Sequence, residues 1–201
     1  MPEHNTITDP NIHEPKGVSA ASVGQVYSAD GAGSGSWEKI YLQGFEDYND
    51  SGTTQNLTSG AWVDIENDGA GGNTTTAYKL PGFTDLWDTT NHEFDWSSLS
   101  LGDTVDIRFD ISVTTSANND EIALRLDMAH GSGNDYSLEV YRDVIKNSGT
   151  TQIVRFHSLY MGDNDTLNNP AKVAMFSDSA GDSVVVNGWY IRVVPRNPVF
   201  D

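Results

Sequence analysis

TVDIRFDISVT, residues 104–114, alternates strictly between polar and apolar side chains. Val105, Ile107 and Phe109 share one face of an extended chain, while Asp106 and Arg108 share the other. This period of two is typical of a β-strand that buries one face and exposes the other to water. The stretch therefore predicts a strand at the surface of a hydrophobic core.

Eight further segments carry β patterns, and clusters of Asn, Asp, Ser and Gly separate several of them, as tight turns require. No segment predicts an amphipathic helix, and residues 81–103 are expected to form a long loop or an irregular edge. About nine antiparallel strands predict an all-β, jelly-roll-like sandwich. The eight segments are WEKIYLQ (37–43), AWVDIEN (61–67), TTAYKL (75–80), EIALRLDMA (121–129), YSLEVYRDV (136–144), TQIVRFHSLYM (151–161), AKVAMFS (171–177) and SVVVNGWYIRVV (183–194).

Residues 1–36 differ in composition from the rest of the chain. They contain Pro2, Pro10 and Pro15, and they end in a Gly/Ser-rich run over residues 30–36. Proline restricts the chain to extended geometry, and Gly/Ser runs are typical of flexible linkers. We predict an extended N-terminal arm and linker over residues 1–36, with one short strand at 24–29, followed by a β-sandwich head over residues 37–201.

The composition excludes several classes of protein. The chain has 11 Lys and Arg against 29 Asp and Glu, a formal charge of -18, and it has no cysteine. Phosphate backbones and anionic membranes repel so acidic a surface, so we expect neither a nucleic-acid nor a membrane partner. Disulfides and thiolate sites are excluded. The N-terminus lacks the pattern of a signal peptide, and no apolar run is long enough to span a membrane.

No group of residues forms a recognisable catalytic motif. The five histidines show no metal-ligand spacing, and nucleotide-binding and nucleophile-elbow motifs are absent. Acidic pairs such as Asp106 with Asp110 suit a glycosidase, but with 29 acidic residues such pairs arise by chance. We therefore expect no enzymatic activity, no catalytic residue and no cofactor.

Two weaker binding patterns remain. The loop at 162–169 offers Asp163 and Asp165 as oxygen ligands for Ca²⁺, but it lacks the glycine and glutamate of an EF-hand, so a plain turn is favoured and no metal site is predicted. Aromatic side chains suit a sugar-binding platform, although core positions are the commoner place for them in a sandwich. The candidates are Trp62, Trp87, Trp96 and Trp189.

The N-terminal segment resembles a known family. The strings DPNIHEPKGV (9–18), AASVGQVY (20–27) and DGAGSGSW (30–37) resemble the leading part of tailed-bacteriophage virion proteins, namely head fibres, capsid decoration proteins and some tail fibres. The resemblance covers about a fifth of the chain, and the remainder resembles trimeric jelly-roll heads by pattern alone. It implies an anchor to the major capsid protein or another virion protein. The implied anchor residues are Ile12, His13, Glu14, Pro15, Lys16, Gly17, Val26 and Tyr27.

The resemblance also implies a homotrimer, and residues 183–194 suggest where its interface lies. Both faces of this segment carry apolar side chains, which is typical of a central covered strand or of a subunit contact. Asn187-Gly188 predicts either a bulge or a tight turn. The interface residues expected here are Val184, Val186, Trp189, Ile191 and Val193.

The sequence thus favours a virion structural protein, a decoration protein or head fibre that is assembled onto the particle in the host cytoplasm. One alternative is a tail fibre or tail tip that contacts the host, with a host surface glycan as partner. The other alternative is a carbohydrate-binding module.

Overall fold

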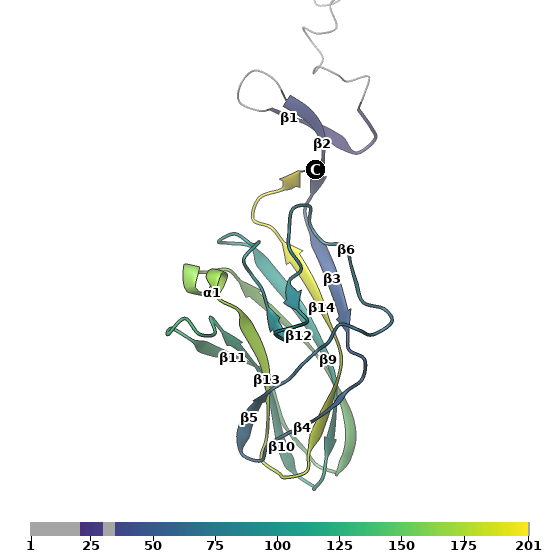
Figure 1. Ribbon diagram of the computed structural model, residues 1–201, viewed down its shortest axis with the longest axis vertical. Helices are drawn as coiled ribbons and strands as arrows, with labels where there is room; N and C mark the ends of the chain where they lie inside the picture. The colour runs from purple at the N-terminus through teal and green to yellow at the C-terminus, as the bar shows by residue number, and fades with distance from the viewer. Residues whose placement is uncertain (1–20, 30–34, 201) are drawn as a thin grey trace, which may run out of the picture. The chain divides into compact units, whose positions relative to one another are not determined.

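The computed structural model describes residues 21–29 and 35–200, and it divides into two compact units (Figure 1). The first unit contains the described residues up to Leu42 together with those from Asn197 onward. The second unit is Gln43–Arg196.

The first unit is a small antiparallel sheet of three strands in the order β1-β2-β15. Tyr27 and Trp37 pack edge to face across its first pair of strands, with ring centroids 5.5 Å apart. Gly35 lies so close to β1 that a Cβ atom there would be 2.1 Å from the Ser28 carbonyl oxygen, so this position requires glycine. The strands are β1 (Gln25–Ala29), β2 (Gly35–Tyr41) and β15 (Val199–Phe200).

This pairing changes the interpretation of the Gly/Ser run. The strand expected at 24–29 is present as β1, but Ala29 faces Gly35 and Ser28 faces Ser36. The run therefore joins two paired strands instead of separating an arm from a head. The boundary predicted after residue 36 falls inside β2, whereas the two units divide after Leu42.

The second unit is an all-β antiparallel sandwich of the jelly-roll type, as the alternation predicted. Its two sheets form the two layers of Figure 1, with five and six strands. Most consecutive long strands cross from one sheet to the other, and only β10 and β11 pair directly. The six-stranded sheet contains β12 (Gly149–Tyr160), β9 (Thr104–Thr115), β14 (Ser183–Val194), β3 (Gly44–Asn49) and β6 (Thr75–Tyr78) in that order, with β4 (Thr54–Asn56) paired to β14.

The five-stranded sheet is built on β10, whose apolar face is as regular as that of β9. Ile122, Leu124, Leu126 and Met128 are all fully buried, as their spacing predicted. The short strand β5 (Ala61–Asp64) lies beside β13, and the Ile65 amide donates to the Val173 carbonyl oxygen at 2.9 Å. The sheet runs in the order β11 (Tyr136–Ile145), β10 (Asp120–Met128), β13 (Ala171–Ser177), β8 (Glu93–Phe94) and β7 (Trp87–Asp88).

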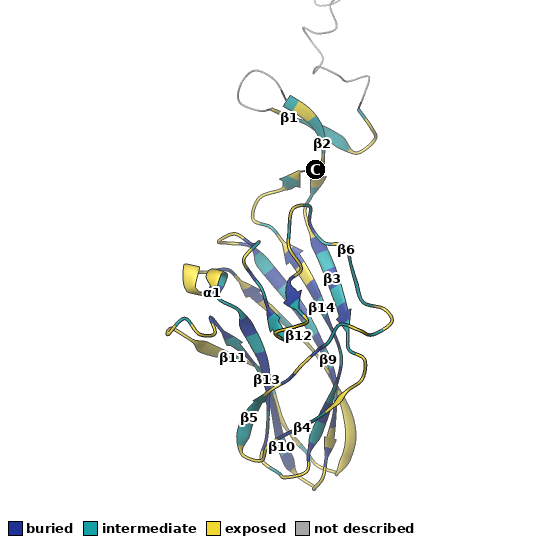
Figure 2. Ribbon diagram, viewed as in Figure 1, coloured by how far each residue is buried: buried dark blue, intermediate teal, exposed yellow. Residues whose placement is uncertain are grey.

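The strands facing the core are coloured as buried in Figure 2, and several aromatic side chains pack together in this core. Trp189 packs edge to face on Phe109 at 5.3 Å and on Trp87 at 6.0 Å, and Phe94 stacks on Trp96 at 4.9 Å. Three of these rings come from residues 81–103. That segment is irregular, as expected, but it contributes two short strands and much of the core.

A bulge in β14 explains why both faces of residues 183–194 look apolar. The register against β9 shifts between Val186 and Gly188, so buried positions fall on even numbers before the bulge and on odd numbers after it. The bulge was one of the two predicted outcomes. The expected interface residues are at most 2% exposed and fill the core of their own chain, so their assignment to a subunit contact is wrong; they are Val184, Val186, Trp189, Ile191 and Val193.

Candidate binding face on the six-stranded sheet

The outer face of the six-stranded sheet carries the polar halves of its alternating strands. Strand register aligns these side chains in two rows across the sheet. Neighbouring strands lie about 4.8 Å apart, so side chains in one row are close enough to act together. The first row is Phe156, Arg108, Tyr190 and Asp47, and the second row is Ser158, Asp106, Arg192, Phe45 and Tyr78.

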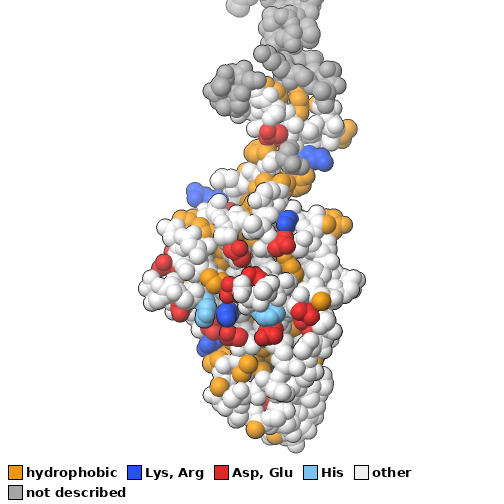
Figure 3. Space-filling view, in the orientation of Figure 1, with side chains coloured by type: hydrophobic (Ala, Val, Ile, Leu, Met, Phe, Trp, Pro, Cys, Tyr) orange, Lys and Arg blue, Asp and Glu red, His pale blue; other side chains and the backbone are white. Residues whose placement is uncertain are grey.

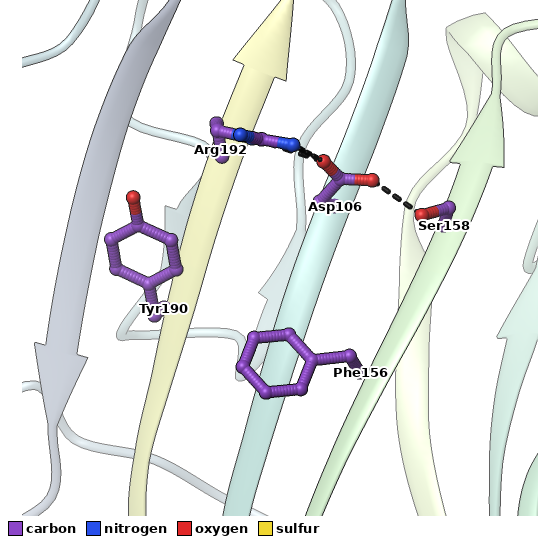
Figure 4. Close-up of a pocket in the computed structure, with 5 residues that line it drawn as sticks. All are labelled: Asp106, Phe156, Ser158, Tyr190 and Arg192. Carbon is purple, nitrogen blue, oxygen red and sulfur yellow. Dashed lines mark hydrogen bonds and ion pairs between the residues drawn. The ribbon is translucent and has the colours of Figure 1, made fainter.

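A hollow of about 380 Å³ lies where the two rows meet (Figure 4). Arg192 and Tyr190 reach it from β14, Asp106 from β9, and Phe156 and Ser158 from β12. Its volume lies within the range of roughly 300–1,000 Å³ that is usual for small-molecule sites. These five side chains are the candidate site, which we call the β14 hollow.

An ion pair forms the polar part of the β14 hollow. The Arg192 guanidinium donates to Asp106 Oδ2 through Nη2 and through Nε, the latter at 3.0 Å, and the Ser158 hydroxyl donates to Asp106 Oδ1. The bond from Ser158, followed by the guanidinium, holds the pKa of Asp106 below its usual value. Asp106 is therefore ionised near neutral pH, and its neighbours hold it in one orientation.

Two rings form the apolar part of the hollow. Phe156 lies on the edge strand β12 and is 72% exposed, and in Figure 4 its ring extends from β12 toward the side of Tyr190. The Tyr190 ring is supported from both sides, by Phe45 with centroids 5.6 Å apart and by the Arg108 guanidinium at 5.7 Å. Phe45 in turn stacks on Tyr78 at 4.8 Å. One ring is thus open to a ligand, while the other is held in place.

The charges on these rows balance one another. The positive charges of Arg108 and Arg192 are matched by the two carboxyl groups of Asp47 and Asp106. Burial raises the pKa of Asp47, although the charge of Arg108 acts in the opposite direction. Elsewhere acids dominate, and Figure 3 shows Asp and Glu side chains gathered across the middle of the face in view, with a few Lys, Arg and His among them. These two rows therefore hold two arginines and two aspartates, within a chain whose formal charge is -18.

The acidic pair Asp106 and Asp110 lies on the outer face of β9, four residues apart. At about 3.3 Å per residue their carboxylates are roughly 13 Å apart along the strand, beyond the roughly 5–9.5 Å of a glycosidase pair. Asp110 is held separately, by Gln152 Nε2 at 2.9 Å and Asn187 Nδ2 at 2.7 Å. The two acids therefore do not face each other across a cleft.

The tryptophans considered for a sugar platform do not form one. Trp87, Trp96 and Trp189 are at most 2% exposed. Trp62 is half-buried over the five-stranded sheet, where the Arg125 guanidinium lies 4.1 Å from its ring centre and Phe176 lies 5.7 Å away. The exposed ring that sequence reasoning missed is Phe156, and the available signal was its place among the polar positions of TQIVRFHSLYM.

The remaining candidates from the sequence are the anchor residues and the two possible calcium ligands. Tyr27 and Val26 lie half-buried in β1, whereas the anchor residues at 12–17 lie outside the described residues. Asp163 caps a short helix, α1 (Asn164–Asn168), that the sequence did not predict, and it accepts from the Thr166 amide at 2.7 Å. Asp165 accepts from Asn134 Nδ2 at 2.8 Å. Both carboxylates therefore have partners within the protein.

The described part of the chain lacks two further kinds of feature. Over residues 21–29 and 35–200, no three His, Asp or Glu side chains gather closely enough to hold a metal ion. No helix in these same ranges has the length and apolar character needed to cross a bilayer.

Comparison with known proteins gives a likeness of fold only. No family model matches the chain, and no curated protein matches it. Eiger TNF from S. frugiperda matches with 11% identity and a TM-score of 0.41, over 79% of this chain and 94% of that one. The T13 viral particle of IBDV matches with 7% identity and a TM-score of 0.46, over 86% of this chain and 38% of that one.

A third solved structure, the CBM22-1 xylan-binding domain of Paenibacillus barcinonensis Xyn10C, matches with 14% identity and a TM-score of 0.38 over 80% of this chain and 97% of that one. At these identities and scores the similarities carry no argument about ligand or partner. The chain is an all-β protein with a jelly-roll-like sandwich.

Proposed function

We propose that this chain is a structural protein of a virus particle, a capsid decoration protein or head fibre that its N-terminal segment anchors. The observation that carries the proposal is the division into two units, a small sheet that includes part of the phage-like strings and a separate sandwich. A restricted, extended peptide has little entropy to lose when it docks on a partner. The sandwich is then free to face the medium.

The acidic surface supports this role. A formal charge of -18 keeps neighbouring copies soluble and repels nucleic acid, which suits a protein on the outside of a particle. The lack of cysteine suits a protein that passes between reducing and oxidising surroundings.

Association with particles tests the proposal. Virus particles banded on a density gradient, from the host that makes this chain, should contain it in a fixed ratio to the major capsid protein. Deleting residues 1–20 removes the string at 12–17 and leaves every described element in place, so the variant should fold and yet not band with particles. Retention of the truncated protein at the full ratio would contradict an anchor at residues 12–17.

We further propose that the chain is not an enzyme. The separation of Asp106 from Asp110 and the lowered pKa of Asp106 both oppose an acid-base pair at this face. Incubation with polysaccharides should release no reducing ends. Turnover that an Asp110→Asn change abolishes would overturn this proposal.

The second candidate function is host contact, as in a tail fibre or a carbohydrate-binding module. The β14 hollow favours it, because the hollow combines an open ring with a fixed ion pair. A chain of this second type should bind to cells or to their glycans in the absence of any particle.

A further inference from the structure

We infer that the β14 hollow binds a neutral oligosaccharide. This inference deepens the second proposed function, because it names the ligand class and the residues of that site. It is independent of the anchor, so the two can fail separately.

The hollow offers a ligand an apolar surface and a polar one. A pyranose ring has an apolar C–H face and a rim of hydroxyl groups. Its apolar face packs on the negative face of an aromatic ring, and Phe156, at 72% exposed, offers such a face. Its hydroxyls need donors and acceptors at the edge of that ring, and the hollow supplies them within one row of Phe156.

The polar groups of the hollow keep hydrogen-bonding capacity for a ligand. Asp106 accepts from Ser158 and Arg192, and it still has lone pairs for a ligand hydroxyl. The Arg192 side chain is 45% exposed and has one terminal nitrogen that is not used in its bonds to Asp106. Because the ion pair already fixes both groups, little side-chain entropy is lost on binding.

The charges of this face and of the whole chain favour a neutral ligand. Arg108 and Arg192 are matched by Asp47 and Asp106 on the same rows, so this face carries no excess of positive charge to attract a carboxylate or sulfate. The rest of the chain, with a net charge of -18, repels anions at longer range. A neutral sugar meets neither obstacle.

The hollow suits a sugar better than a protein partner. A stable protein interface covers about 800 Å² on each side and has an apolar centre. The Asp106–Arg192 ion pair lies in the row next to Phe156 and Tyr190, so the hollow is charged along one row and apolar along the other. Alternation of polar and apolar groups at this spacing suits a ligand the size of one or two sugar rings.

The test is a glycan array that carries neutral and acidic oligosaccharides, probed with the full chain and followed by calorimetry on the strongest neutral glycan. We expect neutral glycans to be bound and acidic ones to be weak. Phe156→Ala and Arg192→Ala should each weaken the affinity at least tenfold. Phe156→Tyr, which keeps the ring, should retain it.

Tyr160→Ala is the matched control. Tyr160 lies on the same strand and the same outer face, it is 69% exposed, and it does not line the hollow, so this change should leave the affinity unaltered. The inference is overturned if no neutral glycan binds, if acidic glycans bind better, or if Phe156→Ala leaves binding intact. Loss of self-association in Phe156→Ala without any glycan binding would identify a second copy as the occupant. A failed array with particle banding intact would reject this site alone.

Discussion

Glu46 is the clearest residue at which burial and charge oppose each other. It is 1% exposed in β3, and its Oε2 accepts from the Tyr48 hydroxyl and the Leu86 amide, both at 2.8 Å. Its Oε1 is buried and has no hydrogen-bond partner in the described protein. Burial, the largest influence, raises the pKa of Glu46 above its usual value of 4.5.

Glu46→Gln should therefore stabilise the protein at neutral pH relative to the wild type. A glutamine oxygen can still accept from Tyr48 and Leu86, while the cost of a buried carboxylate disappears. Since the folded pKa is raised, the wild type binds more protons when folded, and it loses stability as pH rises from 4.5 through the folded pKa. The gain in Glu46→Gln should thus be near zero at pH 4 and about 1–2 kcal/mol at pH 8 in urea unfolding.

Glu66→Gln is the control for that experiment. It removes the same charge at a side chain that is 64% exposed, so its effect should be within about 0.5 kcal/mol at both pH values. An equal gain in the two variants would mean that net charge, and not burial of Glu46, is responsible.

At the scale of single elements, the bulge in β14 sets which side chains face the β14 hollow. Asn187 is the extra residue, and its side chain donates to Asp110 Oδ1 at 2.7 Å and to the Ser112 hydroxyl at 3.1 Å. Without it, every later residue of the strand would turn to the other face. Tyr190 and Arg192 would then point into the core.

Deletion of Asn187 should consequently prevent folding or lower the free energy of unfolding by several kcal/mol, because Trp189 and Ile191 would leave the core. Asn187→Ala removes only the three hydrogen bonds of a half-buried side chain and should cost roughly 1–3 kcal/mol. Urea unfolding monitored by tryptophan fluorescence compares the two. Similar costs for both variants would contradict the role of the bulge.

The elements also show how far sequence reasoning reaches. The long strands β9 and β10 were predictable because a buried face next to a solvated face imposes a period of two, whereas the bulge in β14 interrupts that period. The strands β4, β7 and β8 have two or three residues, too few for any period to appear. Helix α1 was missed because five residues held by an Asp163 cap resemble a turn.

Pairing is the other limit on prediction. The strand at 24–29 was recognised, but its partner lies beyond a Gly/Ser run that also suits a linker, and local composition cannot distinguish the two. The β14 hollow was missed for the same reason. Phe156, Asp106 and Arg192 lie on three different strands, and only the register brings them together.

At the scale of the whole molecule, the homotrimer remains a prediction with a different candidate contact. The residues first assigned to it are core residues, whereas exposed apolar side chains gather on the edge strands β11 and β12. Tyr136 and Val144 on β11 are 40% and 47% exposed and lie outside the β14 hollow. Such side chains on an edge strand suit a contact between copies.

Light scattering on the full chain at micromolar concentration should give a molar mass three times the 21.9 kDa of one copy. Replacing Tyr136 and Val144 by serine should lower the molar mass of the assembly. The thermal unfolding midpoint should stay within a few degrees of that of the unaltered chain. A stable monomer of the unaltered chain would contradict the trimer.

A cryo-EM map of virus particles from the host that makes this chain tests the proposed function most directly. The expected map has density for the sandwich projecting from the particle surface, with the N-terminal segment against a capsid or other virion subunit and the β14 hollow open to solvent. Particles that lack the chain, or a sandwich packed against the capsid with its N-terminal segment turned outward, would contradict the proposal.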